Sequence, residues 1–128
     1  MKVFANTDVG LVRQLNEDDY CIAHNANDEW MAIVCDGIGG AKAGEVASHT
    51  AVMTMYEAFM KSPVFEKDRQ VDNWIRENLN QANDFIYSKS LKNFNERGMG
   101  TTAVGVIKAH IGTFIFNVGD SRIYADYN

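Results

Sequence analysis

Residues 30–40 read WMAIVCDGIGG, an apolar run that ends on Asp36 and passes directly into a glycine-rich turn. An amphipathic segment begins after the turn, at about Gly44. This order predicts a strand over 30–35 that is buried on both faces, an acidic strand end, a tight loop and a helix. A short carboxylate at a strand end, beside a glycine whose backbone allows close approach, suits a hard metal ion. Asp36 and Gly37 are therefore the centre of a candidate metal site.

Two further acidic turns, at Glu17-Asp18 and at Asp120, are candidates for the same site. Mg²⁺ and Mn²⁺ prefer oxygen ligands in near-octahedral geometry, which carboxylates supply. Because aspartate and glycine are also common turn residues, an ordinary turn is the alternative for each acidic position. Arg13, four residues before Glu17, can bind a phosphate with two parallel hydrogen bonds. Its alternative is a surface arginine paired with the neighbouring acids.

Length and composition narrow the class of protein. A chain of 128 residues with 46% hydrophobic side chains fits one domain with a real core. A net charge of −5 argues against nucleic acid as the main partner. No apolar stretch approaches the ~20 residues of a membrane span, and the first residues lack a signal-peptide pattern. Cys21 and Cys35 do not have the spacing of a zinc site. Both lie in apolar runs, and together with the missing signal-peptide pattern this predicts a reducing, cytoplasmic location.

Two helices and several strands follow from the hydrophobic pattern. A helix is expected over about 44–61, with its apolar face at Val52, Met55, Tyr56 and Phe59. The next helix begins near Asp68 or Asp72. Its apolar stripe consists of Val71, Trp74, Ile75, Asn78, Leu79, Ala82, Phe85 and Ile86. Strands are expected over 2–6 and 20–23, and a hairpin over 101–107 and 112–118.

The strands occur in hairpins and the helices occur as a pair, which predicts an α+β fold of antiparallel sheet covered by helices. A last strand begins near Arg122, and no partner follows it in the sequence. It lies at an edge of the sheet, or the natural fold continues beyond the chain.

Other chemistries find little support. The glycines of 37–44 match neither the P-loop nor the dinucleotide spacing, which leaves a nucleotide-binding switch with little weight. His24, His49 and His110 have no metal-ligand spacing, so surface or capping roles are expected for them. Ser48 and Ser121 do not lie in a G-x-S-x-G elbow, and no Ser/His/Asp order marks either as a nucleophile.

Four ordered motifs span nearly the whole chain. They are TDVGLVRQLNED at 7–18, VCDGIGG at 34–40, GMGTTA at 98–103 and NVGDSR at 117–122. Together they resemble the PP2C (PPM) family of metal-dependent protein serine/threonine phosphatases. The sequences of the motifs are most similar to those of its bacterial branch. The resemblance implies an α-β-β-α sandwich, in which two antiparallel sheets are flanked by helix pairs.

The resemblance also implies roles for the acidic residues. Asp36 matches the aspartate that bridges two Mn²⁺ or Mg²⁺ ions, and Gly37 matches the residue whose carbonyl is a ligand. Glu17 and Asp18 match acids near the metals, which act directly or through water. Asp120 matches the acid associated with a third metal in bacterial members.

The implied reaction is hydrolysis of phosphoserine and phosphothreonine on proteins. Arg13 matches the arginine that binds the substrate phosphate, while a metal-activated water attacks phosphorus in line. Asp36 and Arg13 are thus the expected catalytic residues. Phosphorylated proteins are the expected partners, and a serine/threonine kinase is among them by family analogy.

One departure from the family is large. Its domain is longer, with a later metal-binding aspartate and a C-terminal Gly-x-x-Asp-Asn, and neither is found here. We therefore expect residues 1–128 to be the N-terminal portion of a single PP2C-like domain. Alone, it should have weak or no activity, and its strand at 121–126 favours self-association. The alternative is a non-catalytic pseudophosphatase half that binds a phosphoprotein or a partner chain.

Overall fold

The computed structural model describes residues 18–38, 41–92, 100–119 and 122–127, with 18, 41, 119 and 122–127 described by their backbone alone. The strand expected over 2–6 lies outside these residues. The elements in chain order are β1 (Asp18–His24), β2 (Trp30–Ile38), α2 (Ala41–Met60), α3 (Asp68–Lys92), β3 (Gly100–Ala109), β4 (Gly112–Gly119) and β5 (Arg122–Tyr127).

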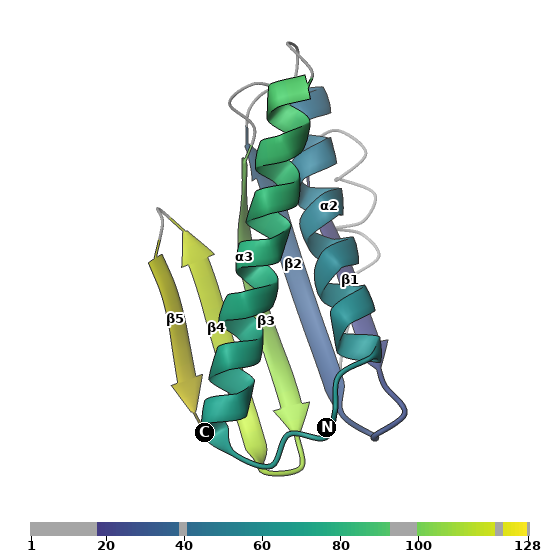
Figure 1. The fold of residues 1–128 in the computed structure, drawn as a ribbon, viewed down its shortest axis with the longest axis vertical. Coiled ribbons are helices and arrows are strands. Elements are labelled where there is room, and N and C mark those ends of the chain that lie inside the picture. Colours follow the sequence, from purple (N-terminus) through teal and green to yellow (C-terminus); the bar gives the residue numbers. More distant parts are fainter. Residues whose placement is uncertain (1–17, 39–40, 93–99, 120–121, 128) are drawn as a thin grey trace.

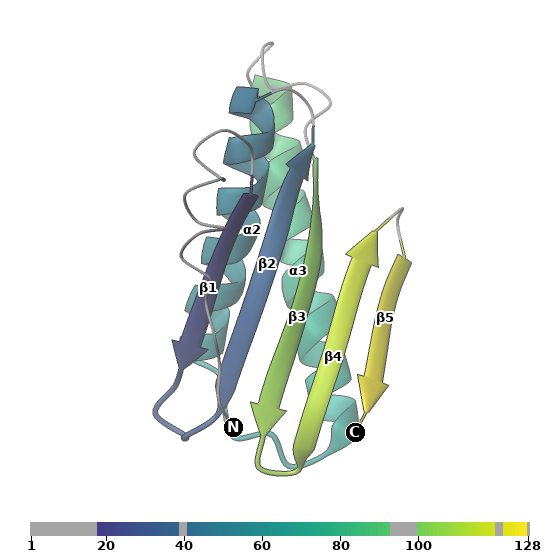
Figure 2. The same ribbon diagram turned by 180° about the vertical axis from the view of Figure 1, so that it is seen from behind.

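The strands form one five-stranded sheet in the order β1-β2-β3-β4-β5, and every neighbouring pair is antiparallel. Although β2 and β3 are neighbours, the two helices lie between them in the sequence. Both helices cover the same face of the sheet, and the view from behind shows no helix on the other face (Figures 1 and 2). The predicted α+β class, with antiparallel hairpins and a helix pair, is confirmed.

Strand β2 alternates between a buried and an exposed face, so the prediction of burial on both faces was wrong. Met31, Ile33 and Cys35 are each at most 1% exposed, whereas Val34 is 49% exposed. The described helices cover only one face, and neighbouring side chains of a strand point to opposite faces. The strand also continues through Asp36 to Ile38, because β3 pairs with these residues and extends the ladder. Asp36 therefore lies inside a strand instead of at its end.

The core is built between the helix pair and the covered face of the sheet. α2 contributes Phe59 and Met55, and its expected apolar face is confirmed. The stripe of α3 is confirmed at Val71, Ile75, Leu79, Ala82 and Ile86. Phe85 was predicted to be buried as well, but it is 46% exposed. It lies at the margin of the stripe, where the side chain faces a groove between the two helices.

The far end of α2 is tied to the turn between β1 and β2. Asn25 is 4% exposed, and its amide group donates to Phe59 O and Ser62 Oγ, both at 3.2 Å. These bonds satisfy carbonyl and hydroxyl groups just where the helix ends. The first two strands and α2 are thereby held as a unit at the end of the sheet remote from Asp36. Within the described part of the chain, neither helix is long and apolar enough to cross a membrane.

Candidate metal centre

Asp36 lies on the uncovered face of the sheet, with its backbone held by strands on both sides. It is exposed, and its Cα partners are Asp18 on β1 and Thr102 on β3. The hydroxyl of Thr101 donates to Asp36 O at 3.1 Å, and that of Thr102 lies 3.5 Å from the same oxygen. Gly37, which follows, is buried. The carboxylate of Asp36 therefore projects to solvent from a fixed backbone.

Asp18 stands directly opposite Asp36 in the β1–β2 register. Opposite residues of an antiparallel pair share one face, with Cβ atoms about 4.5–5.5 Å apart. Two like charges in this relation destabilise a sheet. A divalent cation with oxygen ligands would remove this repulsion, since carboxylates are the ligands it prefers. The residues present thus fit a hard divalent ion.

Asp19, next to Asp18, points to the other face and meets α2. Its Oδ2 lies 2.9 Å from His49 Nδ1, and its Oδ1 accepts a 2.9 Å hydrogen bond from Tyr20 N. Nothing in the local spacing of His49 had predicted this contact, because it joins residues 30 apart in the sequence. The charge of Asp19 is also felt by Cys35, whose pKa is raised to about 12 by burial and then by Asp19.

Three other expected site residues cannot be placed relative to Asp36. Arg13, Glu17 and Asp120 lie outside the described residues, so their roles stay predictions. The register of β4 is nevertheless described. Val118 of β4 pairs with Ala103 of β3, which in turn pairs with Cys35 of β2. The chain thus leaves β4 at the same end of the sheet as Asp36, two strand spacings or roughly 10 Å away.

Within the described ranges, no group of three or more histidine, cysteine, aspartate or glutamate side chains is placed to hold a metal. The described part therefore supplies an incomplete ligand set, whose members are Asp36 and the backbone position of Asp18. This arrangement can hold a divalent cation when further oxygen ligands come from elsewhere in the protein.

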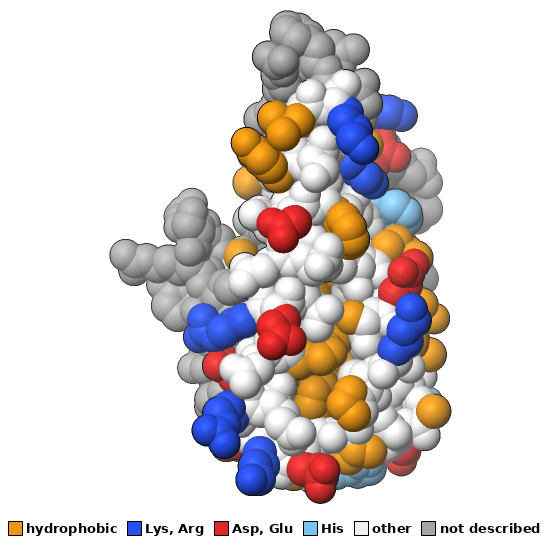
Figure 3. Space-filling view, in the orientation of Figure 1, with side chains coloured by type: hydrophobic (Ala, Val, Ile, Leu, Met, Phe, Trp, Pro, Cys, Tyr) orange, Lys and Arg blue, Asp and Glu red, His pale blue; other side chains and the backbone are white. Residues whose placement is uncertain are grey.

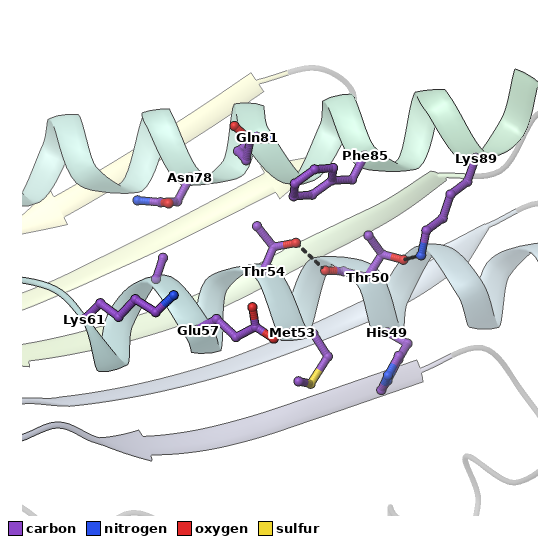
Figure 4. Close-up of a pocket in the computed structure, with 11 residues that line it drawn as sticks. His49, Thr50, Met53, Thr54, Glu57, Lys61, Asn78, Gln81, Phe85 and Lys89 are labelled. Carbon is purple, nitrogen blue, oxygen red and sulfur yellow. Dashed lines mark hydrogen bonds between the residues drawn. The ribbon is translucent and has the colours of Figure 1, made fainter.

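A separate groove of about 580 Å³ lies between α2 and α3 (Figure 4). Lys89 Nζ donates to Thr50 Oγ1 across it at 3.0 Å. The helix side of the molecule shows hydrophobic side chains among scattered charges (Figure 3). Because the helices cover the face opposite to Asp36, the groove is not part of the candidate metal centre.

Comparisons with known proteins place the chain in a family and agree with its fold. A family model described as protein phosphatase 2C matches residues 10–128. The serine/threonine phosphatase stp of Listeria monocytogenes is 36% identical over 118 residues, which are 92% of this chain and 47% of that protein. The crystal structure of the phosphatase Stp1 from Staphylococcus aureus superposes with a TM-score of 0.73 at 33% identity, covering 86% of this chain and 46% of that one.

A more distant likeness extends the fold comparison. The catalytic domain of the phosphatase PstP, solved in complex with two manganese ions, has a TM-score of 0.63 at 22% identity and covers 97% of this chain and 50% of that one. The chain spans about half the length of the curated relatives it matches. With a family model matched over nearly its whole length, the chain belongs to the protein phosphatase 2C family.

Proposed function

We propose that this chain is the N-terminal portion of a metal-dependent phosphatase domain that hydrolyses phosphoserine and phosphothreonine on proteins. The observation that carries the proposal is the position of Asp18 directly opposite Asp36 on the uncovered face of the sheet. Two acidic residues at opposite register positions of one hairpin favour a bound cation. Membership of the protein phosphatase 2C family supplies the reaction class.

In this proposal Asp36, Asp18 and Glu17 hold Mn²⁺ or Mg²⁺ together with the carbonyl of Gly37. Asp120 belongs to a third metal position. When bound, such ions lower the pKa of a coordinated water and supply hydroxide near neutral pH. The PstP domain, which shares the fold, was solved with two manganese ions.

The remaining roles belong to the chain's own residues. Arg13 binds the substrate phosphate, because its planar guanidinium can donate two parallel hydrogen bonds to phosphate oxygens. The threonines of β3 hold the backbone of Asp36 through its carbonyl oxygen. The backbone from which the carboxylate projects is then fixed before any ligand binds.

We further propose that residues 1–128 are one part of a single domain and that the isolated chain is weakly active or inactive. Val34, Val104 and Ile115 are 41–49% exposed on the uncovered face, which is large apolar surface for a folded domain to leave in water. Self-association through β5, the last strand of the described sheet, would bring a second copy alongside.

Phosphorylated proteins are the proposed partners, and a serine/threonine kinase is among them. A cytoplasmic location is also proposed, because Cys21 and Cys35 are free thiols and reducing compartments keep them so.

Titration with Mn²⁺, monitored by calorimetry, tests the metal centre. We expect Asp36→Asn to abolish measurable Mn²⁺ binding, since it removes the central carboxylate charge. Asp28→Asn is the matched control. It removes the same charge in the turn at the other end of β1, at a residue whose φ of 60° asparagine tolerates. Binding that survives Asp36→Asn would sink the metal assignment.

A phosphopeptide assay separates the enzyme from its alternative. The proposal expects little or no hydrolysis by the chain alone in the presence of Mn²⁺, with phosphopeptide binding that depends on Arg13. Rapid turnover by the isolated chain would contradict the expected inactivity. Binding of the phosphopeptide without any Mn²⁺ binding would favour the non-catalytic pseudophosphatase half.

A further inference from the structure

The contact between Asp19 and His49 joins the start of β1 to the middle of α2. His49 Nδ1 lies 2.9 Å from Asp19 Oδ2, and the two side chains are 67% and 29% exposed. The other carboxylate oxygen of Asp19 accepts the backbone N–H of Tyr20 at 2.9 Å. Both oxygens of this carboxylate are thus engaged, one by its own strand and one by the helix.

The location of the contact matters because β1 is the terminal strand on its side of the described sheet. Within the described residues it is paired along one edge, and it begins at Asp18. A terminal strand is the part of a sheet most prone to open locally. A slip of one residue would turn every side chain of β1 to the opposite face.

Neighbouring positions of a strand alternate between the two faces of a sheet. Asp19 is paired with Cys35 and its side chain contacts His49 of α2, while position 18 is paired with Asp36. Locking Asp19 to the helix therefore also sets the face on which Asp18 stands. The like charges of Asp18 and Asp36 would otherwise push this end of the hairpin apart.

We propose that Asp19 and His49 are a positioning pair that holds Asp18 in register opposite Asp36 for metal binding. The inference rests on the proposed metal centre, and it assigns to His49 a role that neither its spacing nor the family motifs indicate. The pair does not touch the metal. It acts through the backbone of β1.

The side chains of His49 and Asp19 are partly exposed, so their contact contributes little to global stability and the expected effect is local. The chain offers a matched pair for comparison at the other end of the same strand. His24 Nε2 lies 2.7 Å from Asp28 Oδ1, with side chains that are 45% and 77% exposed. That pair joins the last residue of β1 to the turn that follows it, and neither residue lies on a helix.

The experiment compares His49→Ala and Asp19→Asn with the control changes His24→Ala and Asp28→Asn. His49→Asn is the rescue variant, because its side-chain N–H₂ can stand where Nδ1 stands. Asparagine is a poorer helix former than alanine. Rescue by His49→Asn would therefore separate positioning of β1 from the stability of α2.

Two readouts are used. The first, without metal, is hydrogen exchange of the backbone amides at 18–20 and 34–36. We expect loss of protection there in His49→Ala and Asp19→Asn, with the rest of the sheet unchanged. The second is Mn²⁺ affinity. We expect it to fall about tenfold in these two variants, the lower range for partners outside the metal's own ligands. His49→Asn and both control variants should behave as the original chain.

Three results overturn the inference. The first is that His49→Ala and Asp19→Asn keep the amide protection and Mn²⁺ affinity of the original chain, while Asp36→Asn loses Mn²⁺ binding. This result would refute the positioning role and leave the proposed metal centre intact. Equal losses in the control variants would show a general effect of removing ion pairs. An original chain that binds no Mn²⁺ would refute the proposed centre itself and the positioning role with it.

Discussion

Gly105 shows how closely the covered side of the sheet is packed. A Cβ placed on this residue would lie 2.2 Å from Cζ of Phe116, the aromatic ring that faces it from β4. Phe116 is fully buried, so its ring has no solvent to move into. The absence of a side chain at 105 is therefore a packing requirement of the β3–β4 pair.

We expect Gly105→Ala to lower the free energy of unfolding by about 1–3 kcal/mol, the usual cost of overpacking a core. Gly100→Ala is the matched control, since a Cβ there would meet no atom within 4 Å. Its effect should stay within about 0.5 kcal/mol. Urea unfolding measures both. Equal effects of the two changes would show that Phe116 yields more easily than the packing indicates.

The two thiols make the stability of the fold depend on pH in the alkaline range. Burial, and then the charge of Asp19, raises the pKa of Cys35 to about 12 and that of Cys21 to about 11, from an ordinary 9.0. The folded state therefore holds these protons more tightly than the unfolded state. Stability from this source is complete below about pH 9 and is lost as the pH rises toward 11–12.

We expect the free energy of unfolding to fall more steeply between pH 9 and 11 in the original chain than in Cys35→Ala. The comparison is needed because lysines and tyrosines also titrate in this range. Urea midpoints at each pH give the two slopes, and the constant loss from the smaller side chain does not affect them. Parallel slopes would mean that Cys35 ionises as easily in the folded state as in the unfolded state.

At the scale of elements, the two faces of the sheet differ in what they contribute to stability. Ile107 of β3 is fully buried beneath the helices, whereas Ile115 of β4 is 41% exposed on the uncovered face. The same type of side chain thus lies once in a packed core and once at the boundary with solvent. Truncating Ile107 would leave a cavity, whereas truncating Ile115 would not.

Ile107→Ala should cost about 2–5 kcal/mol in the free energy of unfolding. Ile115→Ala makes the same change of side chain and should cost less than about 1 kcal/mol, because it leaves no enclosed space. Denaturant unfolding of the two variants is the measurement. A large effect of Ile115→Ala would indicate that something already covers this face in solution.

The sequence could predict each element because the signals for them are local. The stripe of α3 recurs at helical spacing, and the β-branched and aromatic runs of β3 and β4 flank a short turn. Burial of β2 on both faces was wrong for a physical reason. An unbroken apolar run suits any sheet with two covered faces, and the run itself does not reveal what covers the second face.

The candidate site was harder to predict than the fold. Asp36 and Gly37 could be recognised within one motif. The register that sets Asp18 opposite Asp36 could not, because pairing depends on how the whole hairpin closes. The contact of Asp19 with His49 had no local signal at all, since it depends on how α2 lies across β1.

At the scale of the whole molecule, the uncovered face of the sheet is the dominant surface feature. It carries exposed Val34, Val104 and Ile115, which lie on neighbouring strands to one side of Asp36. The opposite face is covered by the helix pair (Figure 1). Exposed apolar patches of this kind mark interaction surfaces in soluble proteins.

We expect the isolated chain to self-associate as its concentration rises, and Val104→Lys to weaken this association by placing a charge on the uncovered face. Tyr87→Lys is the control, because Tyr87 is 63% exposed on α3 at the helix side. Sedimentation velocity over a concentration series measures the association. A chain that stays monomeric throughout, or an equal response to both changes, would contradict a role for this face.

The two pairings of Asp36 differ greatly in chain length. Its partner Asp18 belongs to the same hairpin, while Thr102 is 66 residues away, beyond both helices. Closing the longer loop costs about 1 kcal/mol more in chain entropy, and it must await the helices that fill it. Positions 18 and 36 are thus brought together within one hairpin, ahead of the more distant pairing with β3. In the proposed metal centre, a cation would accordingly find two of its ligand positions in the part of the sheet that closes without the helices.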